Sequence, residues 1–135
     1  MKNIVLGIGH TAYNTPQMDK MLDFYCVKLG FKHAFSIKND AGDPWIEYIK
    51  LADNSFIELF YADKKLDNDS RYAHLCIRVN DIHALADHLK TNGVPIIWGG
   101  PSMGKDKNWQ CWCEDPDGNK IEFMYISPQS PQATA

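Results

Sequence analysis

Hydrophobic and polar positions along the first half of the chain predict one strand, one helix and then three strands. The helix has Thr15 as its N-cap, Pro16 in its first position, apolar residues at helical spacing and an end at Gly30. Asp53 and Asn54 are suited to a tight connection between the last two strands. The predicted strands cover residues 4–12, 31–37, 45–51 and 55–60. This half therefore predicts the order βαβββ.

The second half of the chain repeats that order. Asn80 and Asp81 are predicted to cap a helix that runs through Lys90 and ends at Asn92-Gly93. A Pro- and Gly-containing turn separates the last two strands, and the Gly-rich stretch after the third-last strand is predicted to be a loop. The predicted strands cover residues 72–79, 96–98, 109–113 and 120–126, the turn residues 115–118 and the Gly-rich loop residues 99–105.

The repeated order predicts an α+β fold built from two tandem βαβββ modules. Module 1 covers about residues 4–62 and module 2 about residues 71–127, and together they form one domain of residues 1–127. The final residues, 128–135, combine Pro, Gln, Ser and Thr without apolar periodicity and are predicted to be a disordered tail.

The duplication places two histidines and two glutamates at equivalent positions. His10 and His74 lie in the first strand of their modules, and Glu58 and Glu122 lie in the last strand, with the same separation between equivalent residues. A carboxylate on the inner face of a strand is costly to desolvate unless it is paired or bound to a cation. The alternative is that both glutamates face solvent and pair with lysines, which the alternation of a strand also allows.

Imidazole and carboxylate together are typical ligands of divalent transition metals. Four such ligands suit an octahedral ion that keeps two positions open for water or substrate, and open positions are typical of a catalytic site. The sequence therefore predicts that His10, Glu58, His74 and Glu122 bind one divalent ion, with Ni, Co, Zn and Mn as the candidates.

Composition and charge exclude several classes of partner. The net charge of −3 gives no general attraction to nucleic acid or to an anionic membrane. No run approaches the roughly 18 apolar residues of a membrane span, and the N-terminus does not resemble a signal peptide. We therefore expect a cytoplasmic protein with reduced thiols. Cys111 and Cys113 place two sulfurs on one face of a strand, but no second close pair completes a tetrahedral thiolate site.

The remaining aromatic and histidine residues are predicted to have mainly structural positions. Most of the tryptophans, Trp98 and Trp112 among them, are expected in the core, while Trp45 or Trp109 could line a substrate cleft. The other histidines are expected on strand or helix surfaces: His33, His83 and His88.

Motifs in both modules resemble those of the vicinal oxygen chelate superfamily. They are the early histidine, LDFY at residues 22–25, LGF at residues 29–31 and EDPDGNKIE at residues 114–122. This superfamily includes glyoxalase I, extradiol dioxygenases, methylmalonyl-CoA epimerase and the bleomycin- and fosfomycin-resistance proteins. The resemblance covers about residues 4–127 and implies the paired-module fold of that superfamily.

The order His-Glu-His-Glu, matched by His10, Glu58, His74 and Glu122, most resembles glyoxalase I. The resemblance implies a homodimer in which each metal site forms between two chains. It also implies a lyase or isomerase that moves a proton on a small substrate with vicinal oxygens, such as the hemithioacetal of methylglyoxal and glutathione. Glu122 is the first candidate for the base that moves this proton, and Glu58 is the second.

Three positions depart from the glyoxalase I pattern. Asn14, Ala62 and Ser70 stand where that family often has a basic residue, an asparagine and a second basic residue. The substrate could therefore be another thiol adduct or a small keto compound. Alternative functions within the superfamily are a metal-dependent epimerase or dioxygenase, and a non-catalytic protein that binds a drug or metabolite. The complete set of four ligands argues against the non-catalytic protein.

Overall fold

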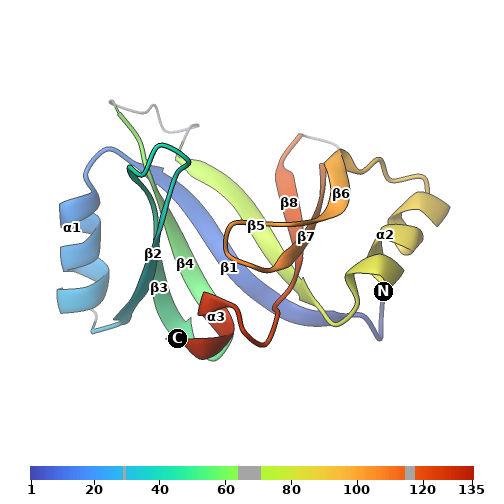
Figure 1. Ribbon diagram of the computed structural model, residues 1–135, viewed down its shortest axis with the longest axis horizontal. Helices are drawn as coiled ribbons and strands as arrows, with labels where there is room; N and C mark the ends of the chain where they lie inside the picture. The colour runs from blue at the N-terminus through green and yellow to red at the C-terminus, as the bar shows by residue number, and fades with distance from the viewer. Residues whose placement is uncertain (29, 64–70, 115–117) are drawn as a thin grey trace. The chain divides into compact units, whose positions relative to one another are not determined.

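The computed structural model describes residues 1–28, 30–63, 71–114 and 118–135 (Figure 1). Residues 115–117 of the turn predicted at residues 115–118 lie outside this part of the chain, as does Ser70, one of the three departures from the glyoxalase I pattern. The chain separates into two compact units. The first-half unit contains His10–Ala73 and Ala135, and the second-half unit contains Met1–Gly9 and His74–Thr134.

The order of elements in the two halves confirms the predicted α+β fold (Figure 1). Each half contains one strand, a helical segment and three further strands. The first strands of the halves are β1 (Val5–Thr15) and β5 (Tyr72–Val79), and each contributes residues to both units. Among the described residues, no helix has the length and apolar content needed to cross a membrane.

The first-half unit is a sheet with the strand order β2-β3-β4-β1. Strand β2 (Lys32–Lys38) pairs antiparallel with β3 (Pro44–Ala52), and β3 pairs antiparallel with β4 (Ser55–Tyr61). The predicted tight connection between β3 and β4 is confirmed, and Asn54 adopts φ 56°, a conformation that asparagine tolerates better than most residues. Strand β1 then returns parallel to β4, so the first and last strands of the half are neighbours.

A helical segment covers one face of this sheet. It consists of α1 (Met18–Leu22) and a π-helical turn, η1 (Asp23–Lys28), and it packs its apolar side chains on Ile49, Ile57 and Leu59. The predicted N-cap at Thr15 is wrong, because Thr15 stays in β1 and pairs with Tyr61. The helix begins later, at Met18, although the Thr15 hydroxyl still accepts a hydrogen bond from the Gln17 N–H.

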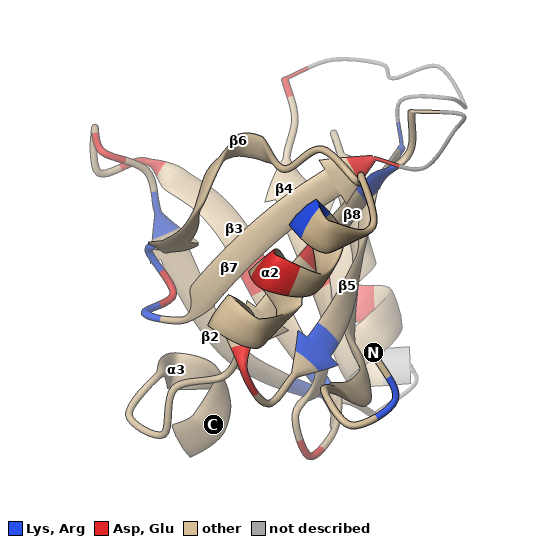
Figure 2. Ribbon diagram, turned by 90° about the vertical axis from the view of Figure 1, so that its right-hand side faces the viewer, with Lys and Arg blue, Asp and Glu red and all other residues tan. Residues whose placement is uncertain are grey.

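The second-half unit repeats the topology with the strand order β5-β8-β7-β6. Strand β8 (Lys120–Tyr125) pairs parallel with β5 and antiparallel with β7 (Trp109–Glu114). The helix α2 (Ile82–Thr91) lies across these strands (Figure 2). Its buried face, Ile82, Leu85, Ala86 and Leu89, shares a core with apolar residues of β5, β7 and β8.

The predicted cap of α2 is confirmed. The Asp81 carboxylate accepts hydrogen bonds from the N–H groups of His83 (3.0 Å) and Ala84 (2.9 Å). We expect Asp81→Ala to lower the free energy of unfolding by about 1 kcal/mol, since these N–H groups lose their acceptor. Chemical denaturation measures the change, with Asp87→Ala, an exposed site within the same helix, as the control. Equal unfolding midpoints for the two variants would contradict a capping role.

Two segments near the end of the chain differ from expectation. The Gly-rich stretch predicted as a loop belongs to β6 (Ile97–Met103), which pairs with β7 at both ends and is irregular between them. Residues 131–134, expected to be disordered, form helix α3 (Pro131–Thr134). The tail is ordered because buried Asn108 donates a hydrogen bond to Gln132 and accepts one from the Ser127 N–H at 2.9 Å. Such side-chain pairing leaves no trace in hydrophobic periodicity.

Candidate functional site

In the first-half unit, His10 and Glu58 lie on the sheet face opposite α1. Alternation along β4 directs Ile57 and Leu59 toward the helix and Glu58 away from it. The register of β1 with β4 matches Ala12 with Glu58, which places His10 on the same face two positions away. The His10 Nε2 and Glu58 Oε1 atoms are 3.2 Å apart.

In the second-half unit, His74 and Glu122 occupy the equivalent place. Ile121 and Phe123 of β8 belong to the core beneath α2, so Glu122 points to the other face. Cys76 of β5 pairs with Glu122 of β8, so His74, two residues before Cys76, lies on the same face as Glu122. The His74 Nε2 and Glu122 Oε2 atoms are again 3.2 Å apart.

All four side chains are buried. The exposed fractions are 1% for His10, 3% for Glu58, 6% for His74 and 5% for Glu122. The alternative that both glutamates face solvent and pair with lysines therefore does not describe this structure. Each pair joins the first strand of a half to the last one, and it is the parallel pairing of those strands that brings the side chains together.

The donor atoms of each pair suit a divalent cation. A buried carboxylate is costly unless it is hydrogen-bonded, paired or bound to a cation, and both an adjacent imidazole and a metal ion are suitable partners. An imidazole nitrogen and a carboxylate oxygen are both ordinary ligands of transition metals, with bonds of about 2.0–2.2 Å. Two atoms at 3.2 Å have the separation of neighbouring ligands around such an ion. The donor atoms of each pair therefore fit two neighbouring ligands of a divalent metal.

Glu47 carries a further buried carboxylate in the first-half unit. It is 7% exposed, lies on the helix side of β3 and has several hydrogen-bond partners. Its oxygens accept hydrogen bonds from the Tyr61 hydroxyl at 2.9 Å and from Ser36, and one lies 2.6 Å from the Nε2 atom of His33. This network, which the sequence did not reveal, satisfies the carboxylate within the fold. Glu47 therefore has a structural explanation that requires no ligand.

An aromatic side chain borders the pair of the second-half unit. Trp112 in β7 lies directly opposite Glu122 in β8, and its ring is 4.8 Å from the His74 ring in an edge-to-face arrangement. Trp98 packs in turn on Trp112, with ring centroids 5.2 Å apart, and is 69% exposed. The prediction that Trp98 belongs to the core is therefore wrong. Alternation along β7, with buried cysteines on both sides of Trp112, is the signal that could have placed Trp112 beside Glu122.

The tryptophans predicted as candidates for a cleft are packed elsewhere. Trp45 makes an edge-to-face contact with Phe60, and Trp109 packs near His83 and against the core beneath α2. Cys111 and Cys113 belong to that same core. Burial raises the pKa of the Cys111 thiol, which favours the protonated form over the thiolate that binds metals. The two cysteines are therefore core residues.

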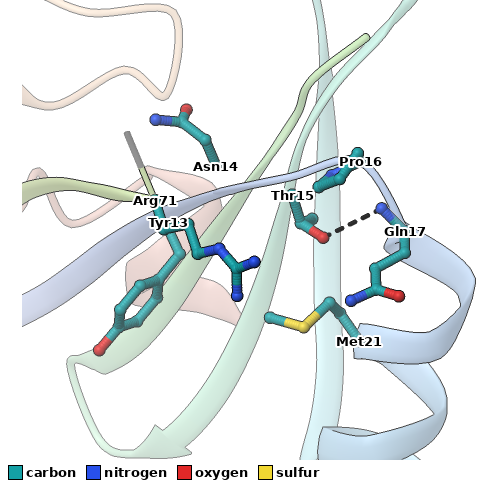
Figure 3. A pocket seen from close by; sticks show the side chains of 7 residues that line it. All are labelled: Tyr13, Asn14, Thr15, Pro16, Gln17, Met21 and Arg71. Carbon is teal, nitrogen blue, oxygen red and sulfur yellow. Dashed lines mark hydrogen bonds between the residues drawn. The ribbon is translucent and has the colours of Figure 1, made fainter. Parts of the chain in front are cut away.

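The first-half unit also contains a cavity of about 400 Å³ (Figure 3). It lies at the end of β1, where the chain turns into α1, and is lined by Tyr13, Asn14, Thr15, Pro16, Gln17, Met21 and Arg71. Figure 3 shows the Arg71 guanidinium among Tyr13, Thr15 and Met21, while the Asn14 amide points away from it. The cavity therefore offers a cation to an anionic group.

Comparison with known proteins agrees with this geometry. A family model described as Glyoxalase/Bleomycin resistance protein/Dioxygenase superfamily matches residues 7–123. A probable lactoylglutathione lyase of Synechocystis sp. is 28% identical over 123 aligned residues, covering 87% of this chain and 94% of that protein. A 2-epi-5-epi-valiolone epimerase of Actinomyces sp. is 26% identical over 152 residues, covering 93% and 82%.

Among solved structures, methylmalonyl-CoA epimerase from Mycobacterium tuberculosis has a similar fold. The TM-score is 0.79 at 20% sequence identity, and the match covers 100% of this chain and 96% of that chain. At this level of identity the similarity concerns the arrangement of the backbone.

Proposed function

Since the chain belongs to the Glyoxalase/Bleomycin resistance protein/Dioxygenase superfamily, we propose that it is a metal-dependent lyase or isomerase of the glyoxalase I type. Its substrate carries two vicinal oxygens, as in the hemithioacetal of methylglyoxal and a thiol, and its product is a 2-hydroxyacyl thioester. The observation that carries this proposal is the pair of buried His/Glu couples with equal spacing in equivalent strands. The relative named as a probable lactoylglutathione lyase supports the same reaction.

The proposed ligands are His10, Glu58, His74 and Glu122, and the proposed ion is Ni, Co, Zn or Mn. When bound, such an ion supplies a Lewis acid that stabilises negative charge on the substrate oxygens. The paired strands hold the imidazoles and carboxylates in fixed positions, so these side chains need little further ordering when they bind an ion. Burial of the four side chains also excludes water from the reacting centre.

Glu122 is the proposed general base. It takes the proton from the carbon that bears the sulfur and returns it to the neighbouring carbonyl carbon. The hemithioacetal thus becomes a 2-hydroxyacyl thioester with no net gain or loss of atoms or electrons. Glu58 is the second candidate, since its position in the first-half unit is equivalent.

The thiol part of the substrate is proposed to be anionic. Asn14 and Ala62 lack the side chains that often contact glutathione in glyoxalase I, but Arg71 lines the cavity of the first-half unit. A guanidinium binds a carboxylate through paired hydrogen bonds, as in many anion sites. Glutathione and other carboxylate-bearing thiols are therefore the substrates to test first.

We also propose that the functional protein is a homodimer, with each metal site built from module 1 of one chain and module 2 of the other. The support is the ligand order, which matches that of glyoxalase I at all four positions. Small-molecule turnover rather than binding to nucleic acid or membrane fits the net charge of −3.

An epimerase of the same superfamily is the second candidate. The Actinomyces relative is named as an epimerase, and it matches nearly the whole chain. An epimerase likewise needs an acidic hydrogen next to a carbonyl and a base to remove it, but a proton then returns to the same carbon on the opposite face. The His/Glu couples suit both reactions, so the substrate that the protein turns over distinguishes a lyase from an epimerase.

The test is an assay of metal-loaded protein with methylglyoxal and glutathione. Metal-free protein is supplied with Ni, Co, Zn or Mn in turn, metal content is determined by elemental analysis, and thioester is followed by ultraviolet absorbance. We expect about one ion per proposed site, and thioester formation that disappears with a chelator and returns with the metal. Bound metal without thioester formation from any thiol adduct would overturn the glyoxalase assignment and favour the epimerase. Failure to bind metal would overturn the whole proposal.

A further inference from the structure

Trp98 has an unusual backbone conformation for so large a residue. Its φ angle is 58°, in the left-handed region that non-glycine residues rarely adopt because Cβ crowds the backbone. Residue Ile97 pairs with Trp112, so regular alternation would direct Trp98 to the face where α2 packs. The left-handed conformation instead brings the Trp98 ring against Trp112. Strained positions of this kind concentrate at functional sites.

Neighbouring side chains hold the two tryptophans in place. The Trp112 indole N–H donates a hydrogen bond to the Gln110 side chain at 3.1 Å. The Lys120 ammonium lies 5.5 Å from the centre of the Trp98 ring and also pairs with Glu114. We call Trp98 and Trp112 together the aromatic wall. Its rings are positioned by contacts within the second-half unit, while Trp98 remains largely open to solvent.

The aromatic wall extends outward from the proposed reacting centre. The Trp112 ring touches His74 on one side and Trp98 on the other, so the wall begins beside the His74/Glu122 pair. The exposed Trp98 ring, next to Trp112, is not part of the core. A planar group on the substrate would cover it and gain the edge-to-face or offset contacts that aromatic rings prefer. A methyl group would leave most of the Trp98 ring in water.

We propose that the aromatic wall binds the non-reacting group of the substrate, and that this group is aromatic. The substrate class is then the thiol adduct of an aromatic 2-oxoaldehyde, in which a phenyl or larger ring replaces the methyl of methylglyoxal. This inference rests on the proposed function and adds to it a choice of substrate. Trp98 determines this preference for an aromatic group, whereas Trp112 also contacts His74.

The test compares the glutathione adducts of phenylglyoxal and methylglyoxal in the metal-loaded protein. We expect the wild type to have a higher kcat/KM for the phenyl adduct. The variant Trp98→Gly removes the ring and also relieves the positive φ, so it is expected to fold at least as well as the wild type. Its kcat/KM should fall about 3- to 10-fold for the phenyl adduct, the size of an aromatic pair contact, and less than about twofold for the methyl adduct.

Two further variants separate recognition from structure. Trp98→Phe should retain most of the preference, because it keeps an aromatic ring. Met103→Ala, at a 54% exposed site on the same strand, should leave the preference unchanged. Equal losses for both adducts in Trp98→Gly, or no preference in the wild type, would overturn the inference while leaving the proposed reaction intact.

A binding measurement keeps the inference testable without turnover. Calorimetry would compare mandelate, an aromatic 2-hydroxy acid, with lactate, which has a methyl group in its place. We expect mandelate to bind more tightly to the wild type and to lose that advantage in Trp98→Gly. If neither adduct is turned over but mandelate shows this dependence, the proposed reaction fails and the aromatic wall stands. Equal binding of mandelate and lactate would overturn the wall.

Discussion

Replacing Glu122 by Gln is expected to lower kcat for thioester formation by about 10²–10⁴-fold, the usual contribution of a positioned general base. Glutamine keeps the size of the side chain and an oxygen that can still act as a ligand, but it does not accept the substrate proton. Steady-state kinetics with elemental analysis of the same sample would measure the loss of turnover separately from any loss of metal.

Glu47→Gln is the matched control for this variant. Glu47 is also a buried glutamate on a strand, and its oxygens contact Tyr61, Ser36 and His33. We expect this control to change stability and leave kcat within about threefold, since Glu47 lies on the helix side of its sheet, on the face opposite Glu58. If Glu58→Gln is far more damaging than Glu122→Gln, then Glu58 is the base.

His10→Ala and His74→Ala are expected to abolish both metal binding and activity when each is made alone, since each removes one of four ligands. Co-expression of the two variants should restore about a quarter of the wild-type activity. Half of the dimers formed at random contain one chain of each kind. In such a dimer, one proposed site carries both substitutions and the other carries neither.

Differently tagged chains would allow the mixed dimers to be purified and assayed. Mixed dimers without activity would contradict sites shared between chains and indicate that one chain supplies all four ligands. Undiminished metal content in either single variant would contradict the ligand assignment itself. His83→Ala, on the exposed side of α2, is the control for removing an imidazole.

The strand positions of the two histidines and two glutamates could be predicted from the sequence because two simple rules apply to them. Strand alternation decides which face a residue occupies, and the repeated order of elements matches residues between the halves. His10 with Glu58, and His74 with Glu122, are adjacent because the first and last strands of each half pair in parallel. That pairing is a property of the βαβββ topology rather than of any local sequence.

Features that depend on single tertiary contacts could not be predicted from strand alternation or from the repeated order of elements. Strand β6 is irregular, and the positive φ of Trp98 reverses the direction that alternation would give. The tail is folded through hydrogen bonds between Asn108 and residues far along the chain. Helix α1 begins later than predicted because Thr15 pairs with Tyr61 of β4 and remains part of β1. In each place a tertiary contact outweighed the local preference.

The parallel pairing of β1 with β4, and of β5 with β8, also bears on how the protein gains its stability. Each His/Glu couple closes a loop that contains the helical segment and the two middle strands of its half, so the couple forms only once these elements are folded. Such contacts between distant parts of the chain form late and slowly. An ion that binds them would select the completely folded chain over partly folded forms, and cellular metal supply would then set how long the protein persists as well as how fast it works.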